Sequence, residues 1–435
     1  MLERFWRKTQ ISEARLKPAL SLSPRAVTVA ELRQLIPLRN FSEEELSAFA
    51  LTQTTETYGP GSILFERGES ESCVLYLLTG TVRMALNDQQ SYEVIAGTAK
   101  ARFPLSYGES HRATAIAITD VEVIRVSAQV MHKNLSAQLK EDRVLDPSRW
   151  EVPLELKSSR LLQAFCQNFQ NEELALPTLP DVALRLRQAI ARDGIGVAEA
   201  AKIVQADPSI AAKLLHVANS PLYLCAQPAK SCLEAVSRLG LKATCSLVVS
   251  FCLSGLFKSK DEFLGRRMRA LWQEAVHVSA LAYVLAKDNR WPSPEEALLA
   301  GLVCDIGQIP LLAFADGFPK DQYRPQEIEP VCLVVCGPIG YYLLKRWSFP
   351  EELVNVPLLS ALWHYDSGPT LTVSDIVMLA RLHRYLETGR IAEVPAINAI
   401  PACGKLRDGT LSPEYSLKVL HEAKAQVQEA LSLLR

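Results

Sequence analysis

Several features that would place a chain in a special class are missing from this sequence of 435 residues. Basic and acidic residues nearly cancel, with 47 Lys and Arg against 48 Asp and Glu, so there is no global positive field to hold nucleic acid. The ten cysteines form no CxxC pair, and a chain of this length can build a core without disulfides. This cysteine usage indicates reduced thiols and a cytoplasmic protein.

Long hydrophobic runs are also scarce. Among the long uncharged stretches are Ala243–Phe257 and Val331–Leu344, and both are shorter than the roughly 18–20 residues that a membrane-spanning helix needs. Residues 1–25 lack the apolar core of a signal peptide and carry six basic and two acidic residues. We therefore expect no membrane span and no secretion. The basic N-terminal segment, residues 1–25, is either a lightly docked terminus or an amphipathic anchor.

Residues 26–135 have the pattern of a small β-structure. A helix is expected over Val29–Ile36, and another after Ser42, whose hydroxyl can cap the acidic turn that follows it. Farther along, short apolar runs alternate with turns, and the spacing predicts a β-roll. Two pairs of runs are interpreted as hairpins: Val74–Leu78 with Val82–Leu86 around Thr79-Gly80-Thr81, and Ala113–Ile118 with Val121–Val126 around Thr119-Asp120.

Helical patterns replace the strands from Ser127 onward. Asp207-Pro208 is typical of a helix start, because Asp caps and Pro suits the first helical position, and Asn219 and Gly240 are typical helix ends. We predict a multidomain α+β chain in which an N-terminal β-roll precedes an all-α domain. The expected parts are a roll over residues 26–135, a linker with helix over 136–165, the helical domain over 166–388, and a loop with a final helix after Ser412 over 389–435.

The N-terminal pattern resembles the cyclic nucleotide-binding domain. In that family an Arg pairs with the cyclic phosphate, and an upstream Gly-Glu offers backbone N–H groups and a carboxylate for the ribose. Arg112 falls on the Arg position, and a guanidinium suits a pair of phosphate oxygens. Ala101-Arg102 stands in place of Gly-Glu, so a cation replaces the carboxylate. The resemblance rests on Tyr58-Gly59-Pro60-Gly61, Phe65-Glu66-Arg67-Gly68-Glu69, Tyr76–Val82 and Arg112-Ala113-Thr114.

Three uses of the roll remain open at this point. The first is ordinary binding of a cyclic mononucleotide, which the loss of Gly-Glu disfavours. The second is a spacer or dimerisation module in which Arg112 lies on a solvated face. The third is a different anionic ligand, attracted by Arg102 and Arg112 together.

The helical region contains six motifs in a set order: Leu176–Pro180, Asp207–Leu215, Ala218-Asn219-Ser220, Ala235–Gly240, Gly301–Gly307 and Gly340–Pro350, with Trp272 between the fourth and the fifth. In the order and spacing of these motifs, residues 165–385 resemble the HDOD family, an output domain related to the metal phosphohydrolases of the HD type. The resemblance implies an all-α fold and a role in bacterial signal transduction, around cyclic-di-nucleotide enzymes or histidine kinases.

An active enzyme of that type surrounds one or two metal ions with His and Asp side chains, and the metal activates water. Most of these positions are changed here. The central His-Asp is Cys304-Asp305, an upstream His position maps to Glu274, a further one to Cys336, and the final His-His reads Trp363-His364. The resemblance therefore implies a remnant of the HD pocket made of Glu274, Cys304, Asp305, Cys336 and His364, with no catalytic residue.

We expect this remnant pocket to be filled and dry, with no metal and no other cofactor, since buried Cys behaves as a small hydrophobic residue. Two alternatives stay open. Thiolate and imidazole ligands would suit zinc if the helices bring together Cys304, Asp305, Cys336, Glu274 or His277, and His364. An unknown small ligand could also occupy the space.

Three classes of function follow. The favoured one is a cytoplasmic, non-catalytic signalling protein in which the degenerate roll is coupled to a helical domain that binds a partner protein; an oligomer is compatible with this. The second is a metal-dependent phosphohydrolase of a nucleotide second messenger, with Asp305 and His364 as ligands. The third is a DNA-binding regulator, which the net charge of -1 and the lack of an Arg/Lys-rich recognition helix disfavour, so we expect no nucleic acid partner.

Overall fold

A computed structural model describes residues 22–407, with gaps at 42, 71, 88–89, 108–109, 129–138, 151, 193–194, 221–222 and 224–226, and then residues 418–419 and 421–422. The chain divides into two compact units. The first contains residues 1–140, 363–368 and 388–411, and the second contains residues 141–362, 369–387 and 412–435. The observed division differs from the expected one in two segments: residues 363–368, expected in the helical domain, and the loop over residues 388–411 both belong to the first unit. The basic segment up to residue 21, the Ser42 cap, the start of the linker and most of the final helix lie outside the described residues.

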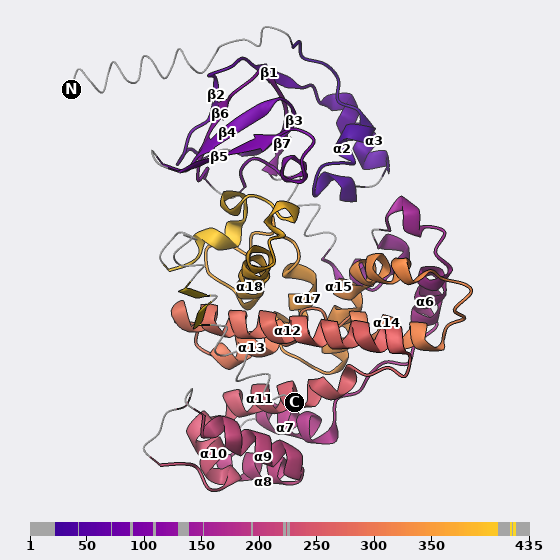
Figure 1. Cartoon of the computed structure of the whole chain (residues 1–435), viewed down its shortest axis with the longest axis vertical. Coiled ribbons are helices and arrows are strands. Elements are labelled where there is room, and N and C mark those ends of the chain that lie inside the picture. The colour runs from indigo at the N-terminus through magenta and orange to yellow at the C-terminus, as the bar shows by residue number, and fades with distance from the viewer. Residues whose placement is uncertain are drawn as a thin grey trace, which may run out of the picture. The chain divides into compact units, whose positions relative to one another are not determined.

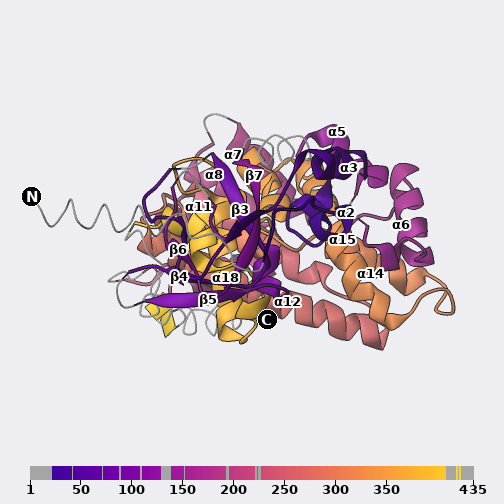
Figure 2. The ribbon, with the colours of Figure 1, turned by 90° about the horizontal axis from the view of Figure 1, so that it is seen from above.

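Two antiparallel sheets form the first unit, with the strand orders β1-β7-β3 and β2-β6-β4-β5. Figure 2 shows β3 beside β7 and, separately, β4 between β5 and β6. Two short helices, α2 (Val29–Leu32) and α3 (Glu43–Thr52), precede the strands. The strands are β1 (Glu56–Tyr58), β2 (Ile63–Phe65), β3 (Cys73–Thr79), β4 (Thr81–Ala85), β5 (Ser91–Ile95), β6 (Thr114–Ala117) and β7 (Val121–Ser127).

Both faces of β3 are buried, which explains why this strand reads as an unbroken apolar run. Leu75 and Leu77 point into a core that also contains residues of the second sheet, such as Met84. Val74 and Tyr76 alternate with them and belong to a second core with residues from α2 and α3, such as Leu46. The first sheet is therefore the middle layer of the unit, between the second sheet and the two helices.

All four strands of the two predicted hairpins are present, but the predicted pairing is wrong in both cases. Strand β3 pairs with β7, and β4 pairs with β5 and β6, so each turn carries the chain from one sheet to the other. Gly80, between β3 and β4, has φ +85°, and a Cβ there would lie 2.3 Å from the carbonyl oxygen of Asp120. The Thr81 N–H donates to Thr119 Oγ1 at 3.0 Å. The two turns that cross between the sheets, β3 to β4 and β6 to β7, are thus packed against each other.

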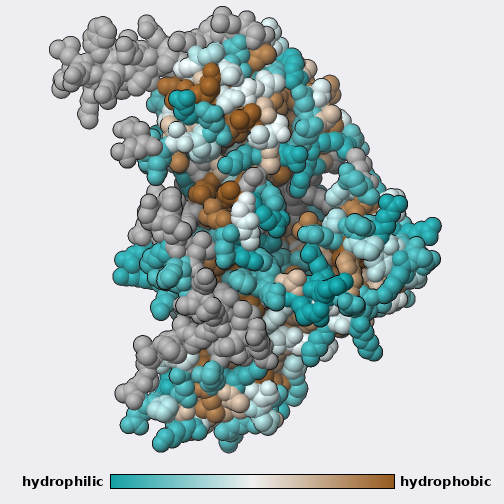
Figure 3. Space-filling view, viewed as in Figure 1, coloured by the Kyte–Doolittle hydropathy of each residue, from teal (hydrophilic) through white to brown (hydrophobic). Residues whose placement is uncertain are grey.

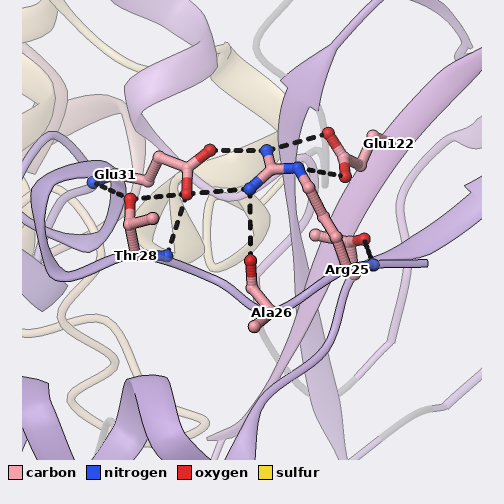
Figure 4. Close-up of polar contacts among 6 residues, drawn as sticks. Arg25, Ala26, Thr28, Glu31 and Glu122 are labelled. Carbon is pink, nitrogen blue, oxygen red and sulfur yellow. Dashed lines mark hydrogen bonds and ion pairs between the residues drawn. The ribbon is translucent and has the colours of Figure 1, made fainter. Parts of the chain in front are cut away.

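Arg25 ties the start of the first unit to its sheet (Figure 4). Its guanidinium contacts the carboxylates of Glu31, at 2.6 Å, and Glu122, at 2.9 Å. Glu122 lies on β7 and is only 3% exposed, so its charge needs this partner. Glu31 also closes a capping box with Thr28 at the start of α2. Hydrogen bonding to Arg25 lowers the pKa of Glu31 to about 2.

The second unit is helical, and no strand occurs among its described residues. The long α12 runs across it with α13 alongside (Figure 1). The predicted caps are confirmed: Asp207 accepts from the N–H groups of Ser209 and Ile210, and Gly240 ends a helix with φ +81°. The helices are α5 (Glu141–Val144), α6 (Arg160–Gln170), α7 (Asp181–Ala191), α8 (Val197–Gln205), α9 (Pro208–Ala218), α10 (Cys232–Leu239), α11 (Leu241–Leu253), α12 (Glu262–Asp288), α13 (Pro294–Val303), α14 (Gln308–Gly317), α15 (Ile328–Arg346), α16 (Glu351–Val354), α17 (Val356–Leu359) and α18 (Val373–Glu387).

Two helical stretches of the second unit are long and apolar enough to cross a membrane by length and composition alone. They are Pro294–Gly317 and Pro325–Arg346, and the bent pair Cys232–Leu239 with Leu241–Leu256 would be a third if it counted as one span. The most apolar windows of the first two are 78% and 56% buried inside the protein. On the face in Figure 3, hydrophobic residues are interspersed with hydrophilic ones. The uncharged runs of the sequence are shorter than these two apolar helical stretches. The absence of a membrane span therefore stays a prediction.

The crossing at Gly80 gives a test of the two-sheet arrangement. Gly80→Ala should destabilise the first unit by about 3 kcal/mol, because a left-handed conformation costs a side chain about 1–2 kcal/mol and the Cβ would also collide with Asp120. Gly68→Ala is the matched control, since Gly68 has φ +83° with nothing within 4 Å. It should lose only the conformational part. Urea unfolding measures the loss of stability in both variants, and hydrogen exchange of the amides of β3 and β7 shows where it occurs. Equal losses of stability in Gly80→Ala and Gly68→Ala would contradict the packed crossing.

Candidate functional site

Two glycines place Asp305 between the helices of the second unit. A Cβ on Gly301 would lie 2.5 Å from the Ser279 Cα on α12, and a Cβ on Gly307 would lie 2.0 Å from the carbonyl oxygen of Cys336 on α15. Only glycine permits backbones to approach this closely. The turn that follows α13, with Asp305 on it, is therefore pressed between α12 and α15.

Asp305 is held by a cation and two thiols. Its Oδ1 lies 3.0 Å from Arg381 Nη1 on α18, and these side chains are only 14% and 17% exposed. The Cys336 thiol donates to Oδ1 at 3.4 Å, and the Cys304 thiol lies 3.8 Å from Oδ2 while it also donates to the Gly301 carbonyl at 3.2 Å. The structure thus brings together Cys304, Asp305 and Cys336, as expected, and adds Arg381.

The protonation states follow from this arrangement. Burial, reinforced by the charge of Asp305, raises the pKa values of the Cys304 and Cys336 thiols, so both remain protonated at neutral pH. Burial disfavours a charged Arg381, but the neighbouring carboxylate outweighs it and the pKa of Arg381 is raised. The site therefore holds a neutralised ion pair flanked by neutral thiols.

The donor set does not fit a metal ion. No group of three or more His, Cys, Asp or Glu side chains that could hold a metal occurs in the described part of the chain. A metal ion would have to displace Arg381 from the Asp305 carboxylate and also the protons of the two thiols, whose pKa values are raised by burial.

Glu274 lies on α12 and is paired with a second arginine of α18. Arg384 Nε contacts both of its carboxylate oxygens, at 3.1 and 3.0 Å, and Arg384 also reaches Glu387 on its own helix. Arg381 and Arg384 are three residues apart and so share one face of α18. Each acidic residue of the expected remnant pocket thus has an arginine partner from this helix.

His364 belongs to the first unit, where its ring packs edge-on against Tyr107 with centroids 6.1 Å apart. Arg102 and Arg112 lie in the same unit. Arg102 is exposed at the end of the short turn Ala99–Arg102. Arg112 is half-buried, and its guanidinium donates to the carbonyl oxygens of Ile400 and Pro401 at 3.0 and 2.9 Å.

Sequence reasoning missed the three groups that occupy these sites: Arg381, Arg384 and the segment around Pro401. Arg381 and Arg384 carried a signal, because two cations three residues apart on an apolar helix need buried partners. The segment around Pro401 carried none, since a loop rich in Gly and Pro does not indicate what it packs against.

Comparison with known proteins agrees with both halves of this structure. Residues 176–361 match the family model of the HDOD domain, and residues 55–138 match that of the cyclic nucleotide-binding domain. A solved structure of a candidate metal-dependent phosphohydrolase from Shewanella amazonensis is 29% identical, with a TM-score of 0.51, over 62% of this chain and 98% of that chain. A candidate signal transduction protein from Marinobacter aquaeolei is 19% identical, with a TM-score of 0.44, over 72% and 73%.

An uncharacterized protein of Treponema pallidum is 24% identical over 234 residues, which are 50% of this chain and 43% of that protein. The chain therefore spans less than half the length of this curated relative.

The ion pair at Asp305 gives a stability prediction. Arg381→Ala should lower the free energy of unfolding of the second unit by about 3 kcal/mol, because it leaves a buried carboxylate without its partner. The control Arg266→Ala removes an exposed pair with Glu262 and should cost about 0.5 kcal/mol or less. Urea unfolding followed by tryptophan fluorescence measures both variants.

A double variant sharpens this test. Asp305→Ala combined with Arg381→Ala removes both charges, so it should be more stable than the sum of the two single losses implies. Strict additivity would mean that the two side chains do not stabilise each other.

Proposed function

We propose that this chain, which carries an HDOD domain over residues 176–361 behind a cyclic nucleotide-binding domain over residues 55–138, is a non-catalytic signal-transduction protein of the cytoplasm. In this proposal the HDOD domain acts through contacts with a partner protein, in a cyclic-di-nucleotide or histidine-kinase pathway. The observation that carries the proposal is the ion pair between Asp305 and Arg381.

This ion pair opposes metal-dependent hydrolysis on chemical grounds. Hydrolysis of a phosphate ester by an HD-type site needs a metal ion to activate water and to stabilise the charge that develops on the phosphate. Arg381 supplies a positive charge to Asp305 at 3.0 Å, but a guanidinium cannot lower the pKa of a bound water as a metal does. Displacing Arg381 would leave its own charge buried without a partner.

The first unit supports a regulatory role as well. Arg102 stands where the family has the ribose-binding carboxylate, so the roll has lost one of the two contacts that define the usual ligand. Arg112, the second contact, is retained and already has hydrogen-bond partners within the chain. A roll of this kind suits a module that responds to contacts other than those of a free cyclic nucleotide.

Coupling between the units is supported by the path of the chain. It passes from one unit to the other five times, at residues 140/141, 362/363, 368/369, 387/388 and 411/412. A ligand or partner that stabilises one conformation of either unit therefore acts on segments that are covalently continuous with the other. Such a bias of a conformational equilibrium is how a non-catalytic protein transmits a signal.

The alternative function is a metal-dependent phosphohydrolase of a nucleotide second messenger. The specific observation in its favour is the likeness to the Shewanella structure, whose name describes a candidate of that kind.

Metal content and turnover separate the two functions. The protein, purified under reducing conditions, should contain far less than one metal ion per chain by elemental mass spectrometry. With added Mn²⁺, Fe²⁺ or Zn²⁺ it should hydrolyse bis-p-nitrophenyl phosphate no faster than Asp305→Ala does. The exposed Asp321→Ala is the control. Stoichiometric metal and turnover that are lost in Asp305→Ala and kept in Asp321→Ala would establish the hydrolase instead.

A further inference from the structure

The segment from Ile397 to Gly404 contacts Arg112. This arginine stands at the position of the family's phosphate-binding arginine. Two nitrogens of Arg112, Nη1 and Nη2, donate to the carbonyl oxygens of Ile400 and Pro401 at 3.0 and 2.9 Å. This is the two-pronged pattern that a guanidinium forms with the oxygens of a phosphate. Both the roll and the segment belong to the first unit.

Gly404 makes this close approach possible. A Cβ at this position would lie 2.0 Å from Arg112 Nη2 and 2.3 Å from Arg112 Cζ. The φ of Gly404 is outside the left-handed region, so its backbone does not itself require glycine. The missing side chain therefore serves the contact with the guanidinium and not the local turn.

The middle of the segment is buried. Ile400, Pro401 and Cys403 are buried, and the amides of Ile400 and Cys403 are hydrogen-bonded within the segment. At its end, Lys405 Nζ lies 3.0 Å from Asp366 Oδ1 and 2.7 Å from Ser367 Oγ. These contacts hold the segment in place on both sides of Gly404.

The charge of Arg112 is only partly compensated by this arrangement. Its two hydrogen-bond acceptors are uncharged carbonyls. The Asp366 carboxylate acts on it electrostatically, but this carboxylate is itself paired with Lys405. Burial lowers the pKa of Arg112, which reflects the cost of keeping this cation away from water. Hydrogen bonds to an ionised acceptor are about twice as strong as those to a neutral one, so a phosphate would be a better partner than the two carbonyls.

We propose that residues 397–404 are a built-in occupant of the anion site of the roll, and that a phosphate-bearing ligand binds at Arg112 only when it displaces them. The chain thus carries its own substitute for the ligand phosphate. This inference does not depend on whether the second unit hydrolyses a phosphate ester, since every residue it uses lies in the first.

Two variants of the full chain test it. Gly404→Ala places a Cβ where the guanidinium now lies, so the guanidinium and the segment must separate while Arg112 is kept. Arg112→Ala removes the anchor and the anion site together. Gly317→Ala, which has open space around the new Cβ, is the matched control. The readouts are hydrogen exchange of the amides of residues 399–405 and binding of a fluorescent cyclic AMP analogue, with inorganic phosphate as competitor.

Both Gly404→Ala and Arg112→Ala should exchange faster over residues 399–405 than the unmodified chain and Gly317→Ala. Gly404→Ala alone should bind the analogue about tenfold or more tighter, since the ligand no longer competes with two internal hydrogen bonds. Equal affinity of Gly404→Ala and the unmodified chain would overturn the proposal, as would binding that survives in Arg112→Ala. Unchanged exchange in both variants would also overturn it, because the contact would then not hold the segment.

Discussion

The ion pair between Asp305 and Arg381 is the interaction around which the second unit is organised. A carboxylate on the turn after α13 is pressed between α12 and α15 by Gly301 and Gly307, and a charge in such a place must be compensated. In metal enzymes of related architecture an ion compensates it. Here α18 does so from within the chain, which makes the packing of four helices depend on a single guanidinium. The surroundings of Asp305 thus join helices of the second unit to one another.

At two other places an arginine also holds separate segments together, there by donating hydrogen bonds to main-chain carbonyl oxygens. Arg187 on α7 donates to the carbonyl oxygens of Trp347 and Ser348, and its guanidinium lies 3.7 Å from the centre of the Phe349 ring. Arg112 does the same for a loop of the first unit. The planar guanidinium has five N–H donors in a rigid arrangement, so one arginine can bind two carbonyl oxygens of a loop at once. The flexible lysine side chain with its single ammonium group cannot do this in the same geometry.

Local features were predicted well from the sequence. The cap at Asp207, the helix end at Gly240 and the strands on either side of Gly80 depend on residues close in the chain, and each is confirmed. Which strand pairs with which was predicted wrongly, because a turn residue such as Gly80 indicates a change of direction and not the sheet that receives the next strand.

The candidate site shows the same limit. Cys304, Asp305 and Cys336 come together because the order of the helices constrains them. Arg381 was not anticipated: its place on an apolar helix indicates that it needs a partner, but not that this partner is Asp305, 76 residues away along the chain. His364, expected among the pocket residues, lies in residues 363–368, which belong to the first unit and not to the helical one.

Because the first unit is discontinuous in sequence, its parts are synthesised at different times. The ribosome synthesises residues 22–140 early. The segment that contacts Arg112 is complete only when residue 404 has been added. At ordinary rates of translation the nascent roll waits on the order of tens of seconds for its last segment. During that interval the Arg112 guanidinium lacks the Ile400 and Pro401 carbonyls as acceptors, so these two hydrogen bonds form only after the strands of the roll have been synthesised.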